Sequence, residues 1–308
     1  MFCCSSFAIT ETFASIDTPV LSIVFDDGTI SQYTYAFPLM QARGLHGTFY
    51  VITDQIRDVS GSSHFMSYAE LAVLQDSGNE IGSHGKTHIS FIGRSESWLR
   101  TECSVSKEAL ESHGLTVNNF AYPYGETNDF VNSIVLQYYS SARTAYNYPY
   151  VISAPYPSVL PAGAGITSDA DALSRLKIMV DNLAATDKWG IIFFHDVIPK
   201  LGNQSNAIRA RDFAGFLDYV VSKGIQVRTV NEVLTRTSPT PEPTATPEPT
   251  ATPESTAAPG STAKPESTAT PAPMPSVLPT GGLYTIVIVG IIFAIAAITI
   301  MLTLKKVK

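Results

Sequence analysis

The sequence is poor in basic residues and in cysteine. Its 308 residues include 20 Lys and Arg against 27 Asp and Glu, which gives a formal net charge of −7. No basic stripe is visible along the chain, so a nucleic-acid partner is not expected. The three cysteines contain no CxxC pair, which argues against a zinc ribbon. Cys103 lies in a helix-like stretch, and we predict that it is a small buried apolar residue rather than a reactive thiol.

The N-terminus also lacks basic residues. Residues 1–19 begin with the apolar stretch MFCCSSFAIT but contain no Lys or Arg. Secretory signal peptides carry a positively charged segment before their apolar core, so this one is a poor signal peptide as written. We interpret it as the remnant of a signal sequence that starts upstream, or as a minimal one.

Composition divides the rest of the chain into four parts. Residues 20–236 mix apolar runs, aromatics and turn residues, and are long enough for one large core. Residues 237–282 are rich in Pro, Thr and Glu and repeat TPEPTATPEPTATPEST, which predicts a disordered, extended stalk. Residues 283–304 are almost entirely apolar and uncharged, as a transmembrane helix requires. Residues 305–308 form a basic tail.

The basic tail predicts the orientation of the chain in the membrane. Positive charge stays on the cytoplasmic side of a membrane span, so everything before residue 283 should lie outside. We therefore expect a single-pass protein of the cell membrane with an extracellular globular domain. Residues 276–282 read SVLPTGG, which is one residue short of a sortase-type LPxTG signal, and covalent attachment to the cell wall is the minor alternative.

Strand-like and helix-like patterns alternate through the globular part. Strands are predicted at 20–25, 46–52, 80–83, 120–122, 141–145, 190–195 and 225–229. Helices are predicted between them, at 36–43, 67–77, 95–113, 128–138, 170–184 and 213–222. Ser67 and Glu70 have the spacing of a capping box at the start of the second helix. Strands that alternate with crossover helices predict an α/β fold with a parallel sheet, either open or closed into a barrel.

Polar residues follow the carboxyl ends of several predicted strands. They are Asp26, Asp27, His84, His88, Tyr124 and His195. In parallel α/β barrels these ends converge on one face, where active sites are built. The two histidines of SHGKTH are four residues apart, so both rings can face one metal ion. An HxxxH pair or an Asp-Asp turn is a weak signal alone, but their order at successive strand ends predicts a site.

Four motifs in this order resemble those of the NodB-like polysaccharide deacetylases, a family of carbohydrate esterases. They are SIVFDDG at 22–28, SHGKTH at 83–88, FAYPYG at 120–125 and IIFFHD at 191–196. The resemblance implies a distorted (β/α) barrel of about seven strands. It also implies a hydrolase that removes N-acetyl groups from a polysaccharide or glycan.

The resemblance implies a metal centre without an organic cofactor. Asp27, His84 and His88 would hold a divalent metal, with Zn²⁺ as the expected ion, and would leave one coordination position open for water.

The resemblance also assigns the catalytic groups. Asp26 would be the general base, His195 would protonate the departing amine, and the backbone N–H of Tyr124 would bind the oxyanion. Phe193 matches a position that lines the pocket for the acetyl methyl group. The alternative for Phe193 is an ordinary residue of the strand core.

The sequence departs from the family pattern at two supporting positions. Many members carry Arg where this chain has Ala121, and the Asp-containing fourth motif is not evident. Arg143, in ARTAYN at a predicted strand end, is our candidate for the missing positive partner of Asp26. The alternative for Arg143 is a surface or structural role.

Two other functions remain open on the sequence alone. One is an amidohydrolase that acts on a small non-sugar amide, although a stalk and an anchor favour a polymeric extracellular substrate. The other is a surface glycan-binding protein with a degenerate deacetylase fold. The retained Asp26 and His195 speak against that second alternative, because a binder needs neither a base nor an acid.

Overall fold

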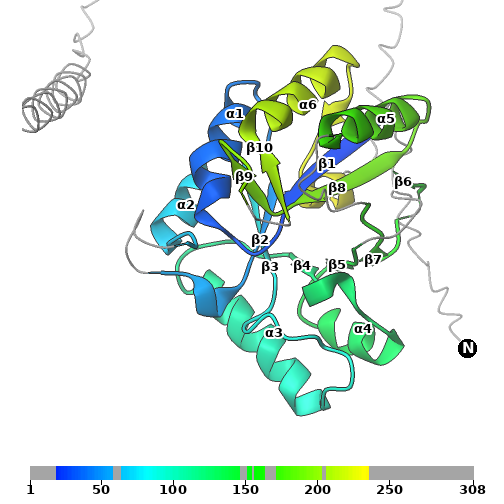
Figure 1. The fold of residues 1–308 in the computed structure, drawn as a ribbon. Coiled ribbons are helices and arrows are strands. Elements are labelled where there is room, and N and C mark those ends of the chain that lie inside the picture. Colours follow the sequence, from blue (N-terminus) through cyan, green and yellow to red (C-terminus); the bar gives the residue numbers. More distant parts are fainter. Residues whose placement is uncertain are drawn as a thin grey trace, which may run out of the picture. The chain divides into compact units, whose positions relative to one another are not determined.

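The computed structural model describes residues 19–57, 64–145, 151–154, 156–163, 171–202 and 206–235 (Figure 1). Within these ranges no helix has the length and apolar character needed to span a membrane. Residues 1–18 and all residues after 235 lie outside them, including the predicted stalk, membrane helix and basic tail.

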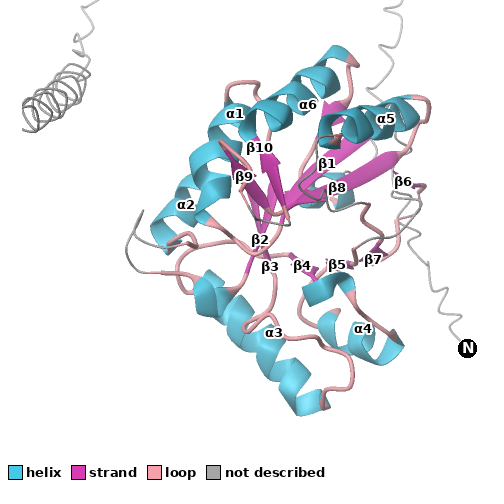
Figure 2. Cartoon of the chain, viewed as in Figure 1, coloured by secondary structure: helices cyan, strands magenta, loops and turns pink. Residues whose placement is uncertain are grey.

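The fold is built on one sheet of nine strands, in which every pair but one is parallel. Figure 2 shows the strands in magenta with helices around them. Its first strand, β1 (Val20–Phe25), lies between β8 (Trp189–Phe194) and β2 (Thr48–Val51), and its first residues also pair with β11 (Gln226–Val227). The order continues through β3 (Glu80–Ser83), β4 (Asn119–Ala121) and β5 (Ser141–Arg143). All of these pairs are parallel, which confirms the alternation of strands and crossover helices predicted from the sequence.

Two short strands that the sequence did not predict bring the sheet back toward itself. β7 (Val159–Leu160) is parallel to β5, and β6 (Val151–Ile152) is antiparallel to β8. Just after β7, the backbone N–H of Gly163 donates to the carbonyl of Ile191 over 3.0 Å. The sheet is therefore a nearly closed barrel, as expected, and its seam lies between the two edge strands β6 and β7, where the segment after β7 reaches β8.

Helices pack around the barrel, the last of them against its interior apolar cluster, and a second small sheet lies near its rim. The helices are α1 (Phe37–Gln41), α2 (Tyr68–Asp76), α3 (Glu96–Glu111), α4 (Asp129–Val135), α5 (Ala172–Ala184), α6 (Ala210–Ser222) and α7 (Val230–Leu234). The small sheet pairs β9 (Asp196–Ile198) with β10 (Ala207–Arg209). The predicted capping box is present, since Ser67 Oγ accepts from Glu70 N and the Glu70 carboxylate accepts from Ser67 N.

The strands are buried on both faces, and each face has its own apolar cluster. Val20 and Val24 of β1 belong to the cluster that includes Tyr50, Trp189 and other interior residues of the barrel. Leu21, Ile23 and Phe25 belong to the larger cluster between sheet and helices. This alternation follows from the two-residue period of a strand, and burial on both faces explains why VLSIVF is apolar at every position except the serine.

A large aromatic side chain fills part of the barrel interior because its neighbour has none. Tyr50 of β2 is fully buried. A Cβ atom at Gly82, on the adjacent strand β3, would lie 2.5 Å from the Tyr50 ring. A side chain at Gly82 would therefore displace the Tyr50 ring.

Cys103 on α3 is fully buried and free, as predicted. Burial raises the pKa of its thiol to about 12, so at pH 8 roughly one molecule in ten thousand carries the reactive thiolate. In a chain with Cys3 and Cys4 replaced by serine, we expect iodoacetamide to leave the native protein unmodified and to alkylate it after denaturation. Mass spectrometry measures the modified fraction.

The matched control is Val105→Cys in the same background, because Val105 is exposed on the same helix. Its thiol should react in the native state. Alkylation of Cys103 at the same rate as this exposed thiol would contradict the burial described here.

Candidate active site

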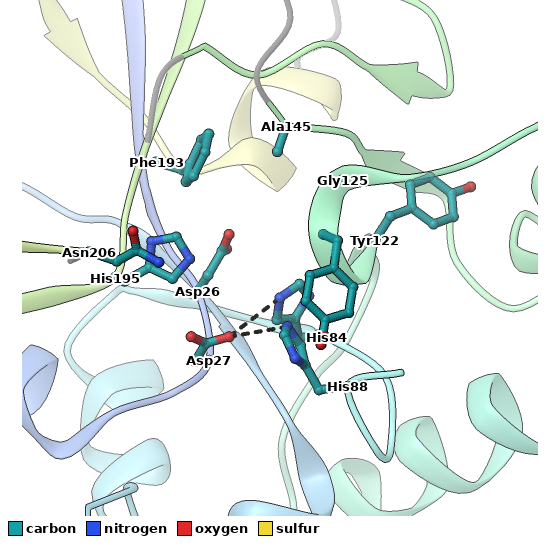
Figure 3. A pocket seen from close by; sticks show the side chains of 11 residues that line it. Asp26, Asp27, His84, His88, Tyr122, Gly125, Ala145, Phe193, His195 and Asn206 are labelled. Atoms are coloured by element: carbon teal, nitrogen blue, oxygen red, sulfur yellow. Dashed lines mark ion pairs between the residues drawn. The ribbon is translucent and has the colours of Figure 1, made fainter. Parts of the chain in front are cut away.

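Residues from the carboxyl ends of four parallel strands meet around one cavity of about 170 Å³ (Figure 3). It is lined by Asp26, Asp27, His84, His88, Tyr122, Tyr124, Gly125, Ala145, Phe193, His195 and Asn206. All of the catalytic and metal-ligating candidates predicted from the sequence are in this set, together with Phe193. The prediction that strand ends converge on one face is therefore confirmed, whereas the chemical roles stay predictions.

Asp27, His84 and His88 point their ligand atoms at one another. Asp27 Oδ1 lies 3.6 Å from His84 Nε2 and 3.4 Å from His88 Nε2, and the three ligand atoms all lie within 4.8 Å of one another. Asp27 Oδ1 is buried and has no hydrogen-bond partner among the described residues. One carboxylate oxygen and two imidazole nitrogens form a common open donor set for a catalytic divalent metal. The residues present therefore fit the metal that the resemblance implies.

The hydrogen bond of one imidazole favours this fit. His84 Nδ1 lies 2.8 Å from the carbonyl oxygen of Ala121, and it must carry the proton to donate there. The lone pair of Nε2 then faces Asp27, as in metal-ligating histidines held by a backbone carbonyl. Lone pairs that face a carboxylate oxygen repel it unless a cation lies between them.

Burial keeps both imidazoles neutral. It lowers the pKa of His84 to about 4, against the opposing effect of the Asp27 carboxylate. Burial also lowers the pKa of His88, again opposed by Asp27. Neutral rings are the form that ligates a metal.

Three residues of the cavity have left-handed backbone conformations. Asp27, His88 and Tyr124 have φ angles of 72°, 60° and 61°, and they are the non-glycine residues with positive φ in the described part of the chain. Such a conformation costs on the order of 1 kcal/mol per residue and persists where the surroundings fix it. Backbone strain is thus concentrated at the cavity.

A buried ion pair lies at one side of the cavity. The carboxylate of Asp26 and the guanidinium of Arg143 are paired through Oδ1 and Nη2, and the two side chains are 5% and 1% exposed. The guanidinium carbon lies 4.8 Å from the ring centroid of Tyr50 and 5.2 Å from that of Phe193. Arg143 Nη1 donates to the carbonyl of Thr144 over 3.2 Å. The pairing of Arg143 with Asp26, hypothesised from the sequence, is present.

The register of the sheet explains how Arg143 reaches this position. In the β4–β5 pair, Arg143 is the direct partner of Ala121, the position at which the family pattern has arginine. Cross-strand partners project to the same face of a parallel sheet. The guanidinium therefore enters the barrel at the expected level from the neighbouring strand, and the methyl group of Ala121 leaves room for it.

His195 lies at the end of β8 beside an aromatic ring. Its imidazole contacts Phe193 edge to face, with centroids 5.7 Å apart and planes at 71°. Burial lowers the pKa of His195; the positive charge of Arg143 acts in the same direction, whereas Asp27 and Asp196 oppose both. Phe193 contacts Arg143 and His195 and also lines the cavity, so it serves both in packing and as cavity wall.

Gln32 is a buried residue of the site that the sequence analysis missed. Its Nε2 donates to the carbonyl of Asp26 over 2.5 Å and to that of His195 over 3.1 Å. One side chain thereby joins the ends of β1 and β8 and sets the separation between the two predicted proton-transfer residues. Gln32 lies in the π-helical turn Gln32–Ala36, and no motif in the sequence marks it.

Asp196 was also missed, and it joins the same two loops from outside the cavity. Its Oδ1 accepts from Thr29 Oγ1 over 2.7 Å and from Ser31 Oγ over 2.6 Å. Its backbone N–H donates to the carbonyl of Asn206 over 3.2 Å, and Asn206 lines the cavity. The proximity of Asn206 to the site depends on the β9–β10 pairing, which the sequence analysis did not predict.

Comparison with known proteins gives a family match over part of the chain. The sequence model of the polysaccharide deacetylase family matches residues 15–142, which include Asp26, Asp27, His84, His88 and Tyr124. The putative polysaccharide deacetylase YxkH of Bacillus subtilis strain 168 is 27% identical over 109 residues. That match covers 35% of this chain and 37% of YxkH.

Two solved structures share the fold at low sequence identity. A family 4 acetyl xylan esterase from Clostridium thermocellum, solved with a cobalt ion, has a TM-score of 0.51 and 18% identity, over 70% of this chain and 90% of the esterase. A T48 deacetylase solved with substrate has a TM-score of 0.51 and 15% identity, over 72% of this chain and 94% of that protein. Residues 15–142 are therefore similar in sequence to the polysaccharide deacetylase family, and the described part of the chain shares its fold with these two structures.

Proposed function

We propose that this chain is a metal-dependent hydrolase that removes N-acetyl groups from an extracellular polysaccharide or glycan. One observation carries the proposal: a three-residue candidate metal-ligand set, the buried carboxylate of Asp26 and the half-buried imidazole of His195 line the same cavity. Amide hydrolysis needs all three, because water must be activated, a proton must be accepted, and the amine must be protonated as it departs.

Asp27, His84 and His88 would hold the metal, with Zn²⁺ as the proposed ion. When bound there, a divalent cation lowers the pKa of a water molecule and polarises the amide carbonyl. The positive φ angles of Asp27 and His88 turn the backbone so that their side chains reach the same point as that of His84.

Asp26 and His195 would move the protons. Asp26 accepts one from the attacking water as the new C–O bond forms, while Arg143 holds the carboxylate in place and balances its charge. His195 gives a proton to the nitrogen as the C–N bond breaks, releasing acetate and a free amine. The lowered pKa of His195 makes its protonated form a stronger acid than an exposed imidazole. The backbone N–H of Tyr124 is proposed to donate to the oxyanion.

Two alternative functions differ from the proposed one, the first in its substrate and the second in having no turnover. An amidohydrolase for a small non-sugar amide would use the same residues, and the predicted stalk and membrane helix favour a polymer over it. A glycan-binding protein without turnover has no need of the Asp26–Arg143 pair and His195 in one cavity.

We further propose that residues 283–304 anchor the chain in the cell membrane with the globular domain outside, wall attachment being the minor alternative.

Acetate release from N-acetylglucosamine oligomers tests the function directly. We expect release by the Zn²⁺-loaded chain, loss of release after a chelator, and recovery when Zn²⁺ is restored. His88→Ala should abolish both metal binding and release, since it removes one of three ligands. His113→Ala is the matched control, because His113 is exposed just beyond the C-terminal end of α3, stacks on Tyr68 and does not line the cavity. Metal-bound protein that releases acetate from no amide or ester substrate would favour the binding alternative.

Moving the arginine from β5 to the neighbouring strand β4 tests the role of Arg143. Arg143→Ala should lower kcat by a factor of 10² or more, since it leaves the buried Asp26 carboxylate without its partner. The double variant Ala121→Arg/Arg143→Ala should recover part of that loss, because position 121 projects to the same face one strand away.

Steady-state kinetics and the pH–rate profile measure the activity of both variants, and circular dichroism checks that each variant is folded. Full activity of Arg143→Ala with an unchanged pH–rate profile would show that Arg143 is not the partner of the base.

Fractionation tests the anchor. We expect the full chain, expressed with a functional signal peptide, to sediment with membranes and to need detergent for release. The same chain ended at residue 236 should be found in the medium. Release of the full chain by high salt alone would contradict a membrane span, and release by a wall-degrading enzyme would favour wall attachment.

A further inference from the structure

One buried carboxylate outside the cavity binds the ligand loop, residues 85–87, which lies between the two proposed metal-ligating histidines. Glu102 lies on α3 outside the cavity and is 2% exposed. Its Oε2 accepts from the backbone N–H groups of Lys86 and Thr87 over 2.9 and 3.0 Å, and its Oε1 accepts from Thr87 Oγ1 over 2.9 Å. A buried carboxylate is expensive unless donors satisfy it, and here all three donors belong to the ligand loop.

The opposite side of the loop is bound to the end of β2. The carbonyls of Gly85 and Lys86 accept from the backbone N–H groups of Thr53 and Asp54 over 3.2 and 3.0 Å. Lys86 Nζ also pairs with the Asp54 carboxylate at 2.7 Å. The amides of Lys86 and Thr87 therefore bind α3, while the carbonyls of Gly85 and Lys86 bind the turn after β2, so the loop is held on two sides.

The first residue of the loop has a left-handed backbone that favours glycine. Gly85 has φ +79°, a conformation that other residues rarely adopt, and a Cβ atom there would be in ordinary van der Waals contact with Glu102 Oε2 at 3.4 Å. The backbone conformation, rather than a lack of space, therefore favours glycine at this position.

The two histidines depend on this loop to different degrees. His84 lies at the end of β3, and its ring is fixed by the carbonyl of Ala121. His88 follows the loop with a left-handed backbone, and its ring contacts those of His84 and Tyr124 at centroid distances of 4.8 Å. Among the described residues no hydrogen bond holds the His88 ring in the way that Ala121 holds His84. The position of His88 is therefore set by the backbone that Glu102 binds.

We infer that Glu102 is a positioning residue of the metal site: its hydrogen bonds to the Lys86–Thr87 backbone place His88 for coordination. The inference rests on the proposed metal-dependent function. It assigns to α3, which contributes no ligand, control over the affinity of the site. Residues that orient metal ligands typically change affinity about 10–100-fold when they are removed.

Zn²⁺ titration of the chelator-treated full chain tests the inference without any assay of activity. Glu102→Leu should bind Zn²⁺ about 10–100-fold more weakly than the unmodified chain. Glu102→Gln should bind nearly as tightly as the unmodified chain, because its amide oxygen can accept from both backbone N–H groups and its NH₂ can donate to the Thr87 hydroxyl. Glu108→Leu is the matched control, since Glu108 is exposed on the same helix, and it should leave affinity unchanged.

Circular dichroism and thermal unfolding without metal separate positioning from misfolding. If Glu102→Leu is unfolded, Thr87→Val tests the same carboxylate by removing one donor, and it should weaken Zn²⁺ binding while the protein stays folded. A folded Glu102→Leu protein with unchanged affinity would overturn the inference. So would a loss in Glu102→Gln as large as in Glu102→Leu, because charge rather than hydrogen bonding would then be responsible. Absence of Zn²⁺ binding by the unmodified chain would instead contradict the proposed function.

Discussion

The buried ion pair between Asp26 and Arg143 constrains the end of the barrel at which the cavity lies. Both side chains are almost fully buried, and removal of one partner from such a pair destabilises a protein by about 3–5 kcal/mol. The rings of Tyr50 and Phe193 flank the guanidinium, and Gly82 leaves space for the first of these rings. The pair thus fixes the carboxylate beside the cavity and the packing of the barrel interior at the same time.

Much of the fold and most of the site could be predicted from the sequence because their signals are local. The apolar run of β1, the capping box at Ser67 and the polar residues at successive strand ends can each be recognised within a few residues. β6 and β7 have two residues each, which is too short for any periodicity. The contacts of Gln32 and Glu102 join segments distant in the sequence, so only the folded chain shows that these side chains serve the site.

Arg143 shows that a site can contain a charged group that the corresponding sequence motif lacks. A search that requires arginine at position 121 would class this chain as degenerate, although a guanidinium occupies the corresponding space from the adjacent strand. What the chemistry needs is a charge at one place in the barrel, and two neighbouring strands can each supply it. The Arg143 hypothesis could be made from the sequence because the residue follows a predicted strand, but its register with Ala121 could not.

The seam of the barrel divides it into parts that tolerate change differently. The residues proposed for chemistry lie at the ends of β1, β3, β4 and β8, and their support comes from β5 and α3. The seam contributes two-residue strands and the bridge at Gly163. No residue of β6 or β7 lines the cavity. Under the proposed function, changes at the seam would therefore leave the candidate metal ligands and proton-transfer residues in place, whereas changes at the ends of β1, β3 and β8 would remove them.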